Sequence, residues 1–343
     1  MIKSMFFSRA NLFQLVLGVF CFLLSSAAFG QSVKLEEYGL RHFQITFRKD
    51  TVDILVQSKK GEEKKIKPII LIEKGSLPVP LILHQGGKPG SIMPFRGSEF
   101  TVDYHLVFIS KPFTPLMAEP NDLAPNMTYG YPEKDKQHPE FSKRDLPEYY
   151  VSRDLEVIRF LKKQPWVDKN KLVLAGHSEG GGIVARVAAA SKDVTHVIYS
   201  SANPFGRMAN IMASIREDDD SVATYAEKQF AFWETIVEKQ NDTEYTGGNS
   251  YKNMFDFSEP ANDYLARLKI PVLVTYGTRD YSAPFNDYLR LDMTRKKKRN
   301  FSFIGYPGLD HNYFQAGPDG KPIIDMAGWN KAAEDWRNWL LKN

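Results

Sequence analysis

Short apolar runs alternate with segments of helical periodicity over most of the chain. The runs lack regular polar alternation, as expected for strands that are covered on both faces. They lie at residues 68–72, 81–83, 104–110, 172–175, 194–200, 271–276 and 301–304, and helical patterns lie at 155–163, 181–191 and 329–341. Strands that alternate with helices indicate a mostly parallel sheet with helices on both faces. We therefore expect an α/β fold from about residue 66 onward, preceded by a hairpin at residues 42–57.

Two segments interrupt this alternation. Residues 204–265 contain one long helical pattern at 221–240 and then a loop, which predicts an insertion over the sheet rather than a separate domain. Residues 111–147 are rich in proline, asparagine and charged residues, which predicts a long loop. Long ordered loops in compact domains often serve a function. Both segments are therefore candidates for covering a site.

The first 30 residues have the layout of a secretory signal peptide. Lys3 and Arg9 precede an apolar run from residue 12 to residue 24, and small residues end at Gly30. The run is shorter than the roughly 20 residues that span a bilayer, so we expect cleavage rather than retention as a membrane anchor. The mature chain, residues 31–343, is then expected in the periplasm or secreted, without stable membrane insertion.

The amino-acid composition excludes several kinds of functional site. The one cysteine, Cys21, lies inside the predicted signal peptide. The mature chain then has no cysteine nucleophile, disulfide or cysteine metal site. The formal net charge of +4 is small, and the basic run at 296–299 is typical of a solvated loop. No pair of histidines has metal-ligand spacing. We therefore expect no metal, no cofactor and no nucleic-acid partner.

The motif Gly176-His-Ser-Glu-Gly180 has a specific setting. An apolar run leads into it, and a helical pattern rich in small residues follows. A serine at such a strand–turn–helix junction presents its hydroxyl above the carboxyl edge of a sheet, and the sharp turn needs small neighbours. Ser178 is therefore a candidate nucleophile, while His177 is expected to pack beside it. The alternative is a glycine-rich turn without chemistry.

A serine hydroxyl needs a base, and the base needs an orienting acid. In this arrangement the acid and then the histidine follow the serine along the chain. Asp280 comes shortly after one predicted strand, and His311, the one histidine after Asp280, follows the last predicted strand. The carboxyl ends of parallel strands share one edge of the sheet, so these side chains are expected to meet Ser178 there. Asp287 and Asp310 are rival acids, but neither follows a strand directly.

With these residues identified, the chain resembles the α/β-hydrolase superfamily. The resemblance rests on the serine motif, on Tyr276-Gly-Thr-Arg-Asp280 and on Leu309-Asp-His311, and it extends over about residues 66–342. It implies the α/β-hydrolase fold, with Ser178 as nucleophile, His311 as base and Asp280 as orienting carboxylate. It also implies that residues 204–265 form a cap over the nucleophile.

Acyl transfer also requires two N–H donors for the negative charge that develops on the substrate. One donor is expected to be the backbone of Glu179, the residue after the nucleophile, and the other comes from a loop after an earlier strand. The candidates for that loop are at Ser76 and at Gly87. Pro78 and Pro80 argue against a central strand before Gly87, because proline cannot donate to a sheet. We therefore favour Ser76.

The predicted cap is rich in aromatic residues, and Trp233 and Phe255 are the predicted substrate-binding residues, although such a pattern is also typical of a core. We expect an exported serine hydrolase that cleaves small carboxylic esters through an acyl-enzyme. A peptidase or acyl-thioesterase with the same triad is the alternative; its peptidase relatives usually carry a propeller-length extension. A non-catalytic binding protein on the same fold is a third hypothesis.

Overall fold

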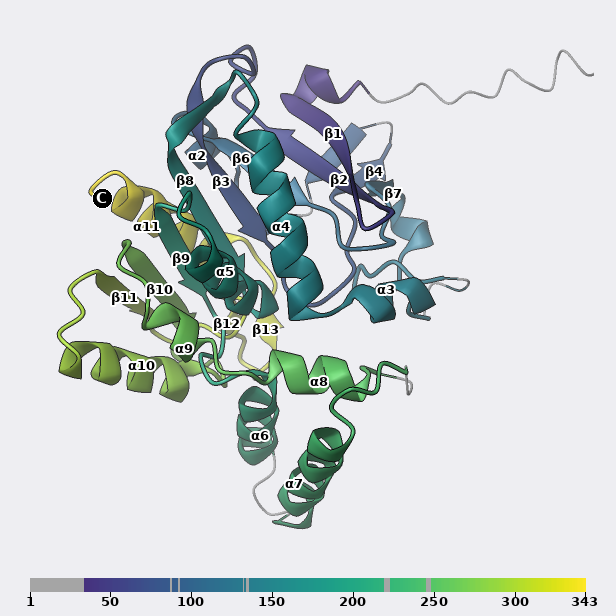
Figure 1. The fold of residues 1–343 in the computed structure, drawn as a ribbon, viewed down its shortest axis with the longest axis vertical. Coiled ribbons are helices and arrows are strands. Elements are labelled where there is room, and N and C mark those ends of the chain that lie inside the picture. Colours follow the sequence, from purple (N-terminus) through teal and green to yellow (C-terminus); the bar gives the residue numbers. More distant parts are fainter. Residues whose placement is uncertain are drawn as a thin grey trace, which may run out of the picture.

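The computed structural model describes residues 34–343 except 87, 92, 132, 134, 135, 219–222 and 245–247. The predicted signal peptide, residues 1–30, lies outside the described residues. The body of the protein is an eight-stranded sheet covered by helices (Figure 1). From one edge to the other, the strands are β1 (Leu40–Phe47), β2 (Asp50–Gln57), β6 (His105–Ile109), β3 (Lys67–Glu73), β8 (Val167–His177), β9 (His196–Ser200), β10 (Val272–Gly277) and β11 (Phe301–Tyr306).

The sheet is mostly parallel. Strands β1, β2 and β6 pair antiparallel. The remaining neighbours, from β6 and β3 through β10 and β11, pair parallel. The carboxyl ends of these parallel strands share one edge, where open α/β sheets form their ligand sites. The α/β-hydrolase fold expected from the sequence is confirmed.

Helices cover both faces of the sheet. One face packs against α4 (Pro147–Leu161), α5 (Glu179–Ala190), α9 (Asn262–Leu265) and α10 (Ala283–Arg295), and the other against α2 (Ser98–Thr101) and α11 (Ala327–Leu340). In β3, Ile69 and Leu71 join the first cluster, whereas Ile70 and Ile72 join the second. Successive strand residues point to opposite faces, so burial of both faces explains the unbroken apolar run.

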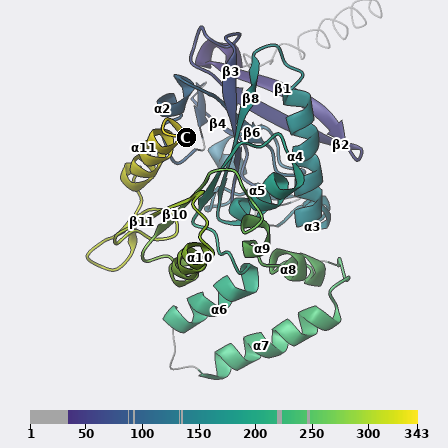
Figure 2. The same ribbon diagram turned by 60° about the vertical axis from the view of Figure 1, so that its left-hand side comes forward.

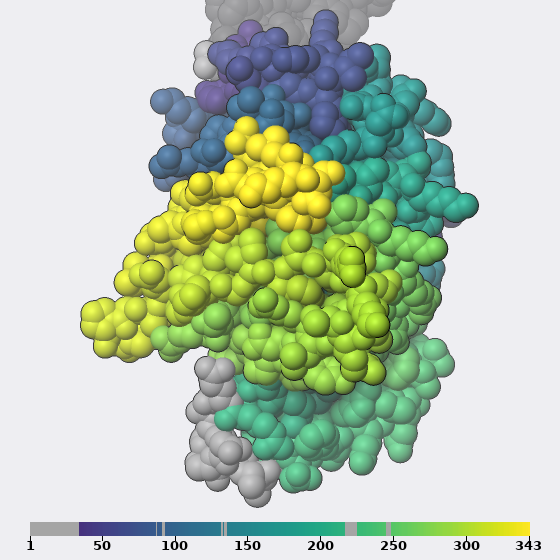
Figure 3. Space-filling model, turned by 90° about the vertical axis from the view of Figure 1, so that its left-hand side faces the viewer, coloured from purple at the N-terminus to yellow at the C-terminus, as the bar shows by residue number. Residues whose placement is uncertain are grey.

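Residues 204–265, which form most of the segment between β9 and β10, are called here the β9–β10 connection. It holds α6 (Arg207–Asp218), α7 (Ala223–Glu238), α8 (Tyr251–Phe257) and α9. Figures 1 and 2 show α6, α7 and α8 extending beyond the sheet, and in the space-filling view they form one end of the molecule (Figure 3). A small apolar cluster of Met208, Ile236 and Met254 joins these three helices.

Some elements differ from the sequence prediction. Strand β4 (Ile82–Gln85) lies outside the main sheet and pairs with β5 (Lys88–Ser91) and β7 (Met117–Ala118). The predicted long loop contains β7 and α3 (Pro139–Arg144), and α6 and α10 were not predicted. A two-stranded sheet of β12 (Gln315–Ala316) and β13 (Pro322–Ile323) follows β11. In the part of the chain that the structure describes, no helix has the length and apolar character needed to cross a membrane.

Candidate active site

Ser178 lies between the end of β8 and the start of α5, in strained backbone. Its φ is 57° and its ψ is −125°, a region that residues other than glycine rarely adopt. The neighbouring glycines permit the turn: a Cβ on Gly176 would lie 2.2 Å from the carbonyl oxygen of Gly180, and one on Gly180 would lie 2.3 Å from that of Glu73. Ser178 is therefore held at the N-terminus of α5, where the helix dipole favours negative charge.

The structure brings Ser178, His311 and Asp280 together at the carboxyl edge of the sheet. The Oγ of Ser178 lies 3.0 Å from Nε2 of His311, and Nδ1 of His311 lies 2.9 Å from Oδ2 of Asp280. The other oxygen of Asp280 accepts the N–H of Ser282 at 2.9 Å. Burial would raise the pKa of Asp280, but the hydrogen bonds from His311 and Ser282 outweigh it and hold the pKa below its usual value. An ionised Asp280 can therefore orient the imidazole toward the serine.

The rival residues have other partners. Asp287 accepts a hydrogen bond from a tyrosine hydroxyl of β10, and Asp310 closes its own turn by accepting two backbone N–H groups. His177 packs edge-on against Trp329, with ring centroids 4.7 Å apart. Burial, together with the neighbouring His311, lowers the pKa of His177 to about 3. This ring stays neutral, in agreement with the packing role expected for it.

Two backbone segments border the Ser178 hydroxyl. Glu179 is the first residue of α5, so its N–H has no acceptor within the helix. The loop after β3 approaches from the other direction: a Cβ on Gly75 would lie 3.9 Å from Oγ of Ser178, and Ser76 lines the same cavity as Ser178. Both predicted donor segments are thus next to the nucleophile, and the donor role of Ser76 stays a prediction. Gly87 lies outside the described residues.

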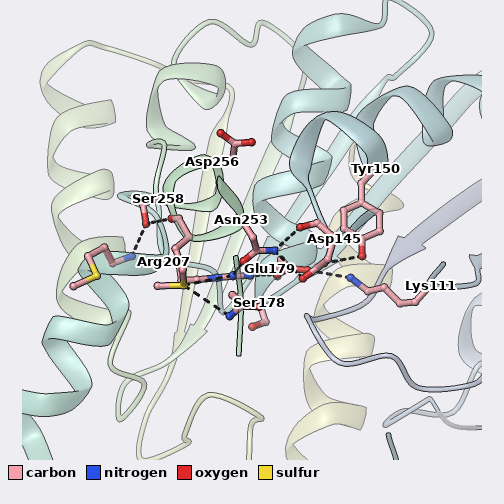
Figure 4. Close-up of polar contacts among 12 residues, drawn as sticks. Lys111, Asp145, Tyr150, Ser178, Glu179, Arg207, Asn253, Asp256 and Ser258 are labelled. Carbon is pink, nitrogen blue, oxygen red and sulfur yellow. Dashed lines mark hydrogen bonds and ion pairs between the residues drawn. The ribbon is translucent and has the colours of Figure 1, made fainter. Parts of the chain in front are cut away.

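The carboxylate of Glu179 is buried between two cations. Its Oε1 lies 3.0 Å from Nζ of Lys111, and its other oxygen pairs with the Arg207 guanidinium. Lys111 follows β6 and Arg207 begins α6, so this carboxylate joins the sheet to the β9–β10 connection (Figure 4). Burial would raise the pKa of Glu179, but the two cations outweigh it and lower the pKa below its ordinary value. The side chain is therefore ionised at neutral pH.

A second buried carboxylate extends this network (Figure 4). Asn253 on α8 accepts a hydrogen bond from Arg207 and donates one to Oδ2 of Asp145 at 2.9 Å. The hydroxyl of Tyr150 on α4 donates to Oδ1 of Asp145 at 2.8 Å. Burial, with the negative charge of Glu179 nearby, raises the pKa of Asp145 to about 6. The network ties the nucleophile turn to α4, α6 and α8.

A cavity with a volume of about 230 Å³ opens beside Ser178. It is bounded by the loop at Ser76, the first turn of α5, the residues after β9 and the first turn of α6. His311 also lines it. Ser178 and His311 therefore face a space that can hold part of a substrate, and we call this space the Ser178 cavity.

The structure places Trp233 and Phe255, the predicted substrate-binding residues, outside the Ser178 cavity. Neither residue lines the Ser178 cavity; both line a separate open hollow, which shares only Arg186 and Glu259 with it among the lining residues. The reason is that the two rings stack on each other, with centroids 6.0 Å apart and planes within 12°, and so join α7 to α8. The apolar residues of the connection that reach the Ser178 cavity are Ile211, Phe257 and Ala261.

The residues that contact Glu179 were not found from the sequence. Lys111 lies in the predicted loop and Arg207 in the predicted insertion, and no spacing relates them. One signal was available: a carboxylate in the first turn of a helix that packs on the sheet needs cationic or hydrogen-bonding partners when it is buried.

Comparison with known proteins places this site in a family. A comparison with curated protein sequences returned no match. Among solved structures, Est1E from Butyrivibrio proteoclasticus is 14% identical with a TM-score of 0.50, and the alignment covers 88% of this chain and 99% of that one. The acylaminoacyl peptidase of Pyrococcus horikoshii is 13% identical with a TM-score of 0.54, over 88% of this chain and 41% of that one. A puromycin-hydrolyzing peptidase of Mycobacterium tuberculosis is 10% identical with a TM-score of 0.53, over 91% and 40%.

At these identities the solved structures support the fold alone, and this chain spans less than half the length of the two peptidases. The sequence profile of the prolyl oligopeptidase family matches residues 130–336, which is more than half of the chain. The matched range contains Ser178, Asp280 and His311. The chain therefore belongs to the prolyl oligopeptidase family and is a serine hydrolase with the α/β-hydrolase fold.

Proposed function

We propose that this serine hydrolase cleaves carboxylic esters with a short acyl group, using Ser178, His311 and Asp280 as its triad. The observation that carries the proposal is the pair of hydrogen bonds, 3.0 Å and 2.9 Å, that links the three side chains beside a cavity lined by Ser178 and His311. The volume of about 230 Å³ is below the range of about 300–1,000 Å³ typical of sites for drug-sized ligands. It suits one short acyl chain.

The proposed reaction has two stages. Oγ of Ser178 attacks the acyl carbon while Nε2 of His311 takes the hydroxyl proton, and Asp280 stabilises the imidazolium. The negative charge on the former carbonyl oxygen is stabilised by the N–H of Glu179 and by that of Ser76. His311 then gives its proton to the leaving alcohol. Water, activated by the same histidine, attacks the acyl-enzyme and releases the acid.

Peptide-bond cleavage is the second candidate, and the family match favours it, because the matched family is described as the prolyl oligopeptidase family. The same triad would then protonate an amine leaving group. An amide needs more assistance to its leaving group than an ester does. The two candidates therefore differ in the ratio of ester to amide turnover for one acyl group.

The test uses purified residues 31–343 and the Ser178→Ala variant. Both are treated with a fluorophosphonate probe, and turnover is measured with a nitrophenyl ester and a nitroanilide of the same acyl group. Labelling and ester turnover in the wild type alone would support the proposal. Equal or faster turnover of the anilide would favour the peptidase. Full activity in the Ser178→Ala variant would remove Ser178 from the mechanism.

We also propose that the protein is exported, on the basis of the signal-peptide pattern in residues 1–30. Expression of the full chain and of residues 31–343 in a bacterial host, followed by cell fractionation, tests this proposal. Export predicts that the full chain is shortened and recovered outside the cytoplasm, whereas the shorter chain stays inside. Recovery of an uncleaved full chain in the cytoplasm would contradict it.

A further inference from the structure

The Ser178 cavity is unusually polar for an acyl pocket. Ten of its sixteen lining residues are polar or charged, and two are glycines. The apolar side chains that line it are those of Ala202, Ile211, Phe257 and Ala261. Most small-molecule sites are lined predominantly by apolar side chains with few polar groups. An unsubstituted alkyl chain would therefore bury against polar groups here and leave them without partners.

The charged side chains of this cavity are already paired. Arg207 binds Glu179 and Asn253. Arg186 donates to the carbonyl oxygens of Gly182 and Glu259 and pairs with the Glu259 carboxylate at 3.3 Å. Neither guanidinium thus depends on an anionic substrate for a partner. These paired arginines therefore do not indicate that the acyl group of the substrate carries a carboxylate.

Two neutral amides have unused hydrogen-bonding capacity. Oδ1 of Asn203 accepts the N–H of Phe205 at 2.9 Å, but its Nδ2 is buried and has no partner among the described residues. Oδ1 of Asn210, one turn into α6, is also buried without a partner among them. Both residues line the Ser178 cavity. Buried polar atoms without partners are rare in folded proteins and call for an explanation.

We propose that the acyl group cleaved by this enzyme carries a hydroxyl, which Asn203 and Asn210 bind inside the Ser178 cavity. A hydroxyl both donates and accepts, so a single group can accept from Nδ2 of Asn203 and donate to Oδ1 of Asn210. A carboxylate cannot donate, and a methyl group can do neither. This inference rests on the proposed ester hydrolase function and makes its substrate class a short hydroxyacyl ester.

Selectivity follows from the polar atoms that a wrong substrate would leave unpaired. A site built to bind a substrate hydroxyl rejects the analogue that lacks it, whereas an apolar pocket discriminates only weakly against an added hydroxyl. The two possibilities therefore predict opposite preferences. A polar acyl site favours the hydroxylated ester by about 100-fold or more, and an alkyl site accepts the methyl analogue at least equally well.

The test compares nitrophenyl 3-hydroxybutanoate, as separate enantiomers, with nitrophenyl 3-methylbutanoate. These acyl groups differ by one hydroxyl in place of one methyl. We expect kcat/KM for the better enantiomer to exceed that for 3-methylbutanoate by about 100-fold. Equal values, or a preference for the methyl compound, would overturn the inference. Fluorophosphonate labelling of the same preparation separates this result from a failure of the serine hydrolase itself.

Matched variants assign the preference to the two amides. Asn210→Leu removes the acceptor at similar volume, and Asn203→Ser removes Nδ2 while keeping an oxygen for the N–H of Phe205. Each should reduce the preference about tenfold or more, and fluorophosphonate labelling checks that Ser178 is still reactive in each variant. Asn262→Leu is the control, because Oδ1 of Asn262 is also buried without a partner among the described residues but Asn262 does not line the cavity. An equal loss of preference in the Asn262 variant would overturn the assignment.

Discussion

Replacing Glu179 by glutamine tests the buried ion pairs beside the nucleophile. The glutamine keeps the shape of the side chain but removes its charge. The side chains of Lys111 and Glu179 are 3% and 6% exposed, and that of Arg207 is 16% exposed. The variant therefore leaves two largely buried cations next to a neutral amide, with Asp145 as the other carboxylate of the network.

The expected loss of stability is large. Removing one partner of a buried ion pair typically costs about 3–5 kcal/mol, because the remaining charge stays desolvated. The glutamine oxygen can still accept one hydrogen bond, so we expect the lower end, about 3 kcal/mol. Exposed pairs contribute about 0–1 kcal/mol. Arg48 and Glu148 form such a pair at 3.0 Å, with side chains 51% and 70% exposed, so Glu148→Gln is the matched control.

Urea unfolding followed by fluorescence measures both variants, with the slope of the transition checked against the wild type. Lys111→Met in the Glu179→Gln background should lose less than the sum of the two single changes, because the methionine removes the unpaired cation. A Glu179→Gln variant within about 1 kcal/mol of the wild type would refute the reasoning, since the buried pairs would then contribute no more than the exposed one. Ester turnover provides a second readout. A shift of the Glu179 backbone N–H away from the substrate oxygen can lower kcat by up to about 10²–10³.

Three further predictions concern the turn, the acid and a buried histidine. Gly180→Ala places a Cβ 2.3 Å from the carbonyl oxygen of Glu73, whereas the Cβ of the control variant Gly248→Ala meets nothing within 4 Å. We expect Gly180→Ala to lower stability in urea unfolding and kcat in ester turnover, and Gly248→Ala to change neither. Asp280→Asn should lower kcat by about 10⁴ with little change in KM, because the imidazole loses its orienting carboxylate; a loss below tenfold would argue against that role. Because the pKa of His177 is about 3 when folded and near 6.5 when unfolded, the unfolded chain binds more protons between these values. Stability should therefore fall as the pH drops below 6.5, by about 1–2 kcal/mol at pH 5 from this group, and His177→Gln should show a shallower pH dependence in urea unfolding.

The three residues of the proposed triad could be located from the sequence because each follows a recognisable strand. Ser178 has an apolar strand before it and a helix after it, and Asp280 and His311 come after the last two strands of the main sheet, β10 and β11. The sheet itself fixes where such residues meet, since the ends of parallel strands share an edge. Local patterns were sufficient for these positions, and the structure brings the three side chains together.

The cavity could not be located in the same way. Seven of its sixteen lining residues come from the β9–β10 connection, whose helices pack through contacts between residues far apart in sequence. Trp233 and Phe255 illustrate the difficulty, because an aromatic pattern does not tell whether the rings face a substrate or each other. The pair of Lys111 and Arg207 around Glu179 is a second example, since ion pairs between a loop and a distant helix leave no periodic signal.

The network around Glu179 has a consequence for protein engineering. Arg207 and Asn253 belong to the β9–β10 connection, while Glu179, Lys111 and Asp145 belong to the body. A chimera that received this connection from a relative would carry over new cavity walls but would also leave buried charges unmatched at the join. Grafts that retain arginine and asparagine at these two positions should therefore fold and turn over substrate, whereas grafts chosen for cavity shape alone should not.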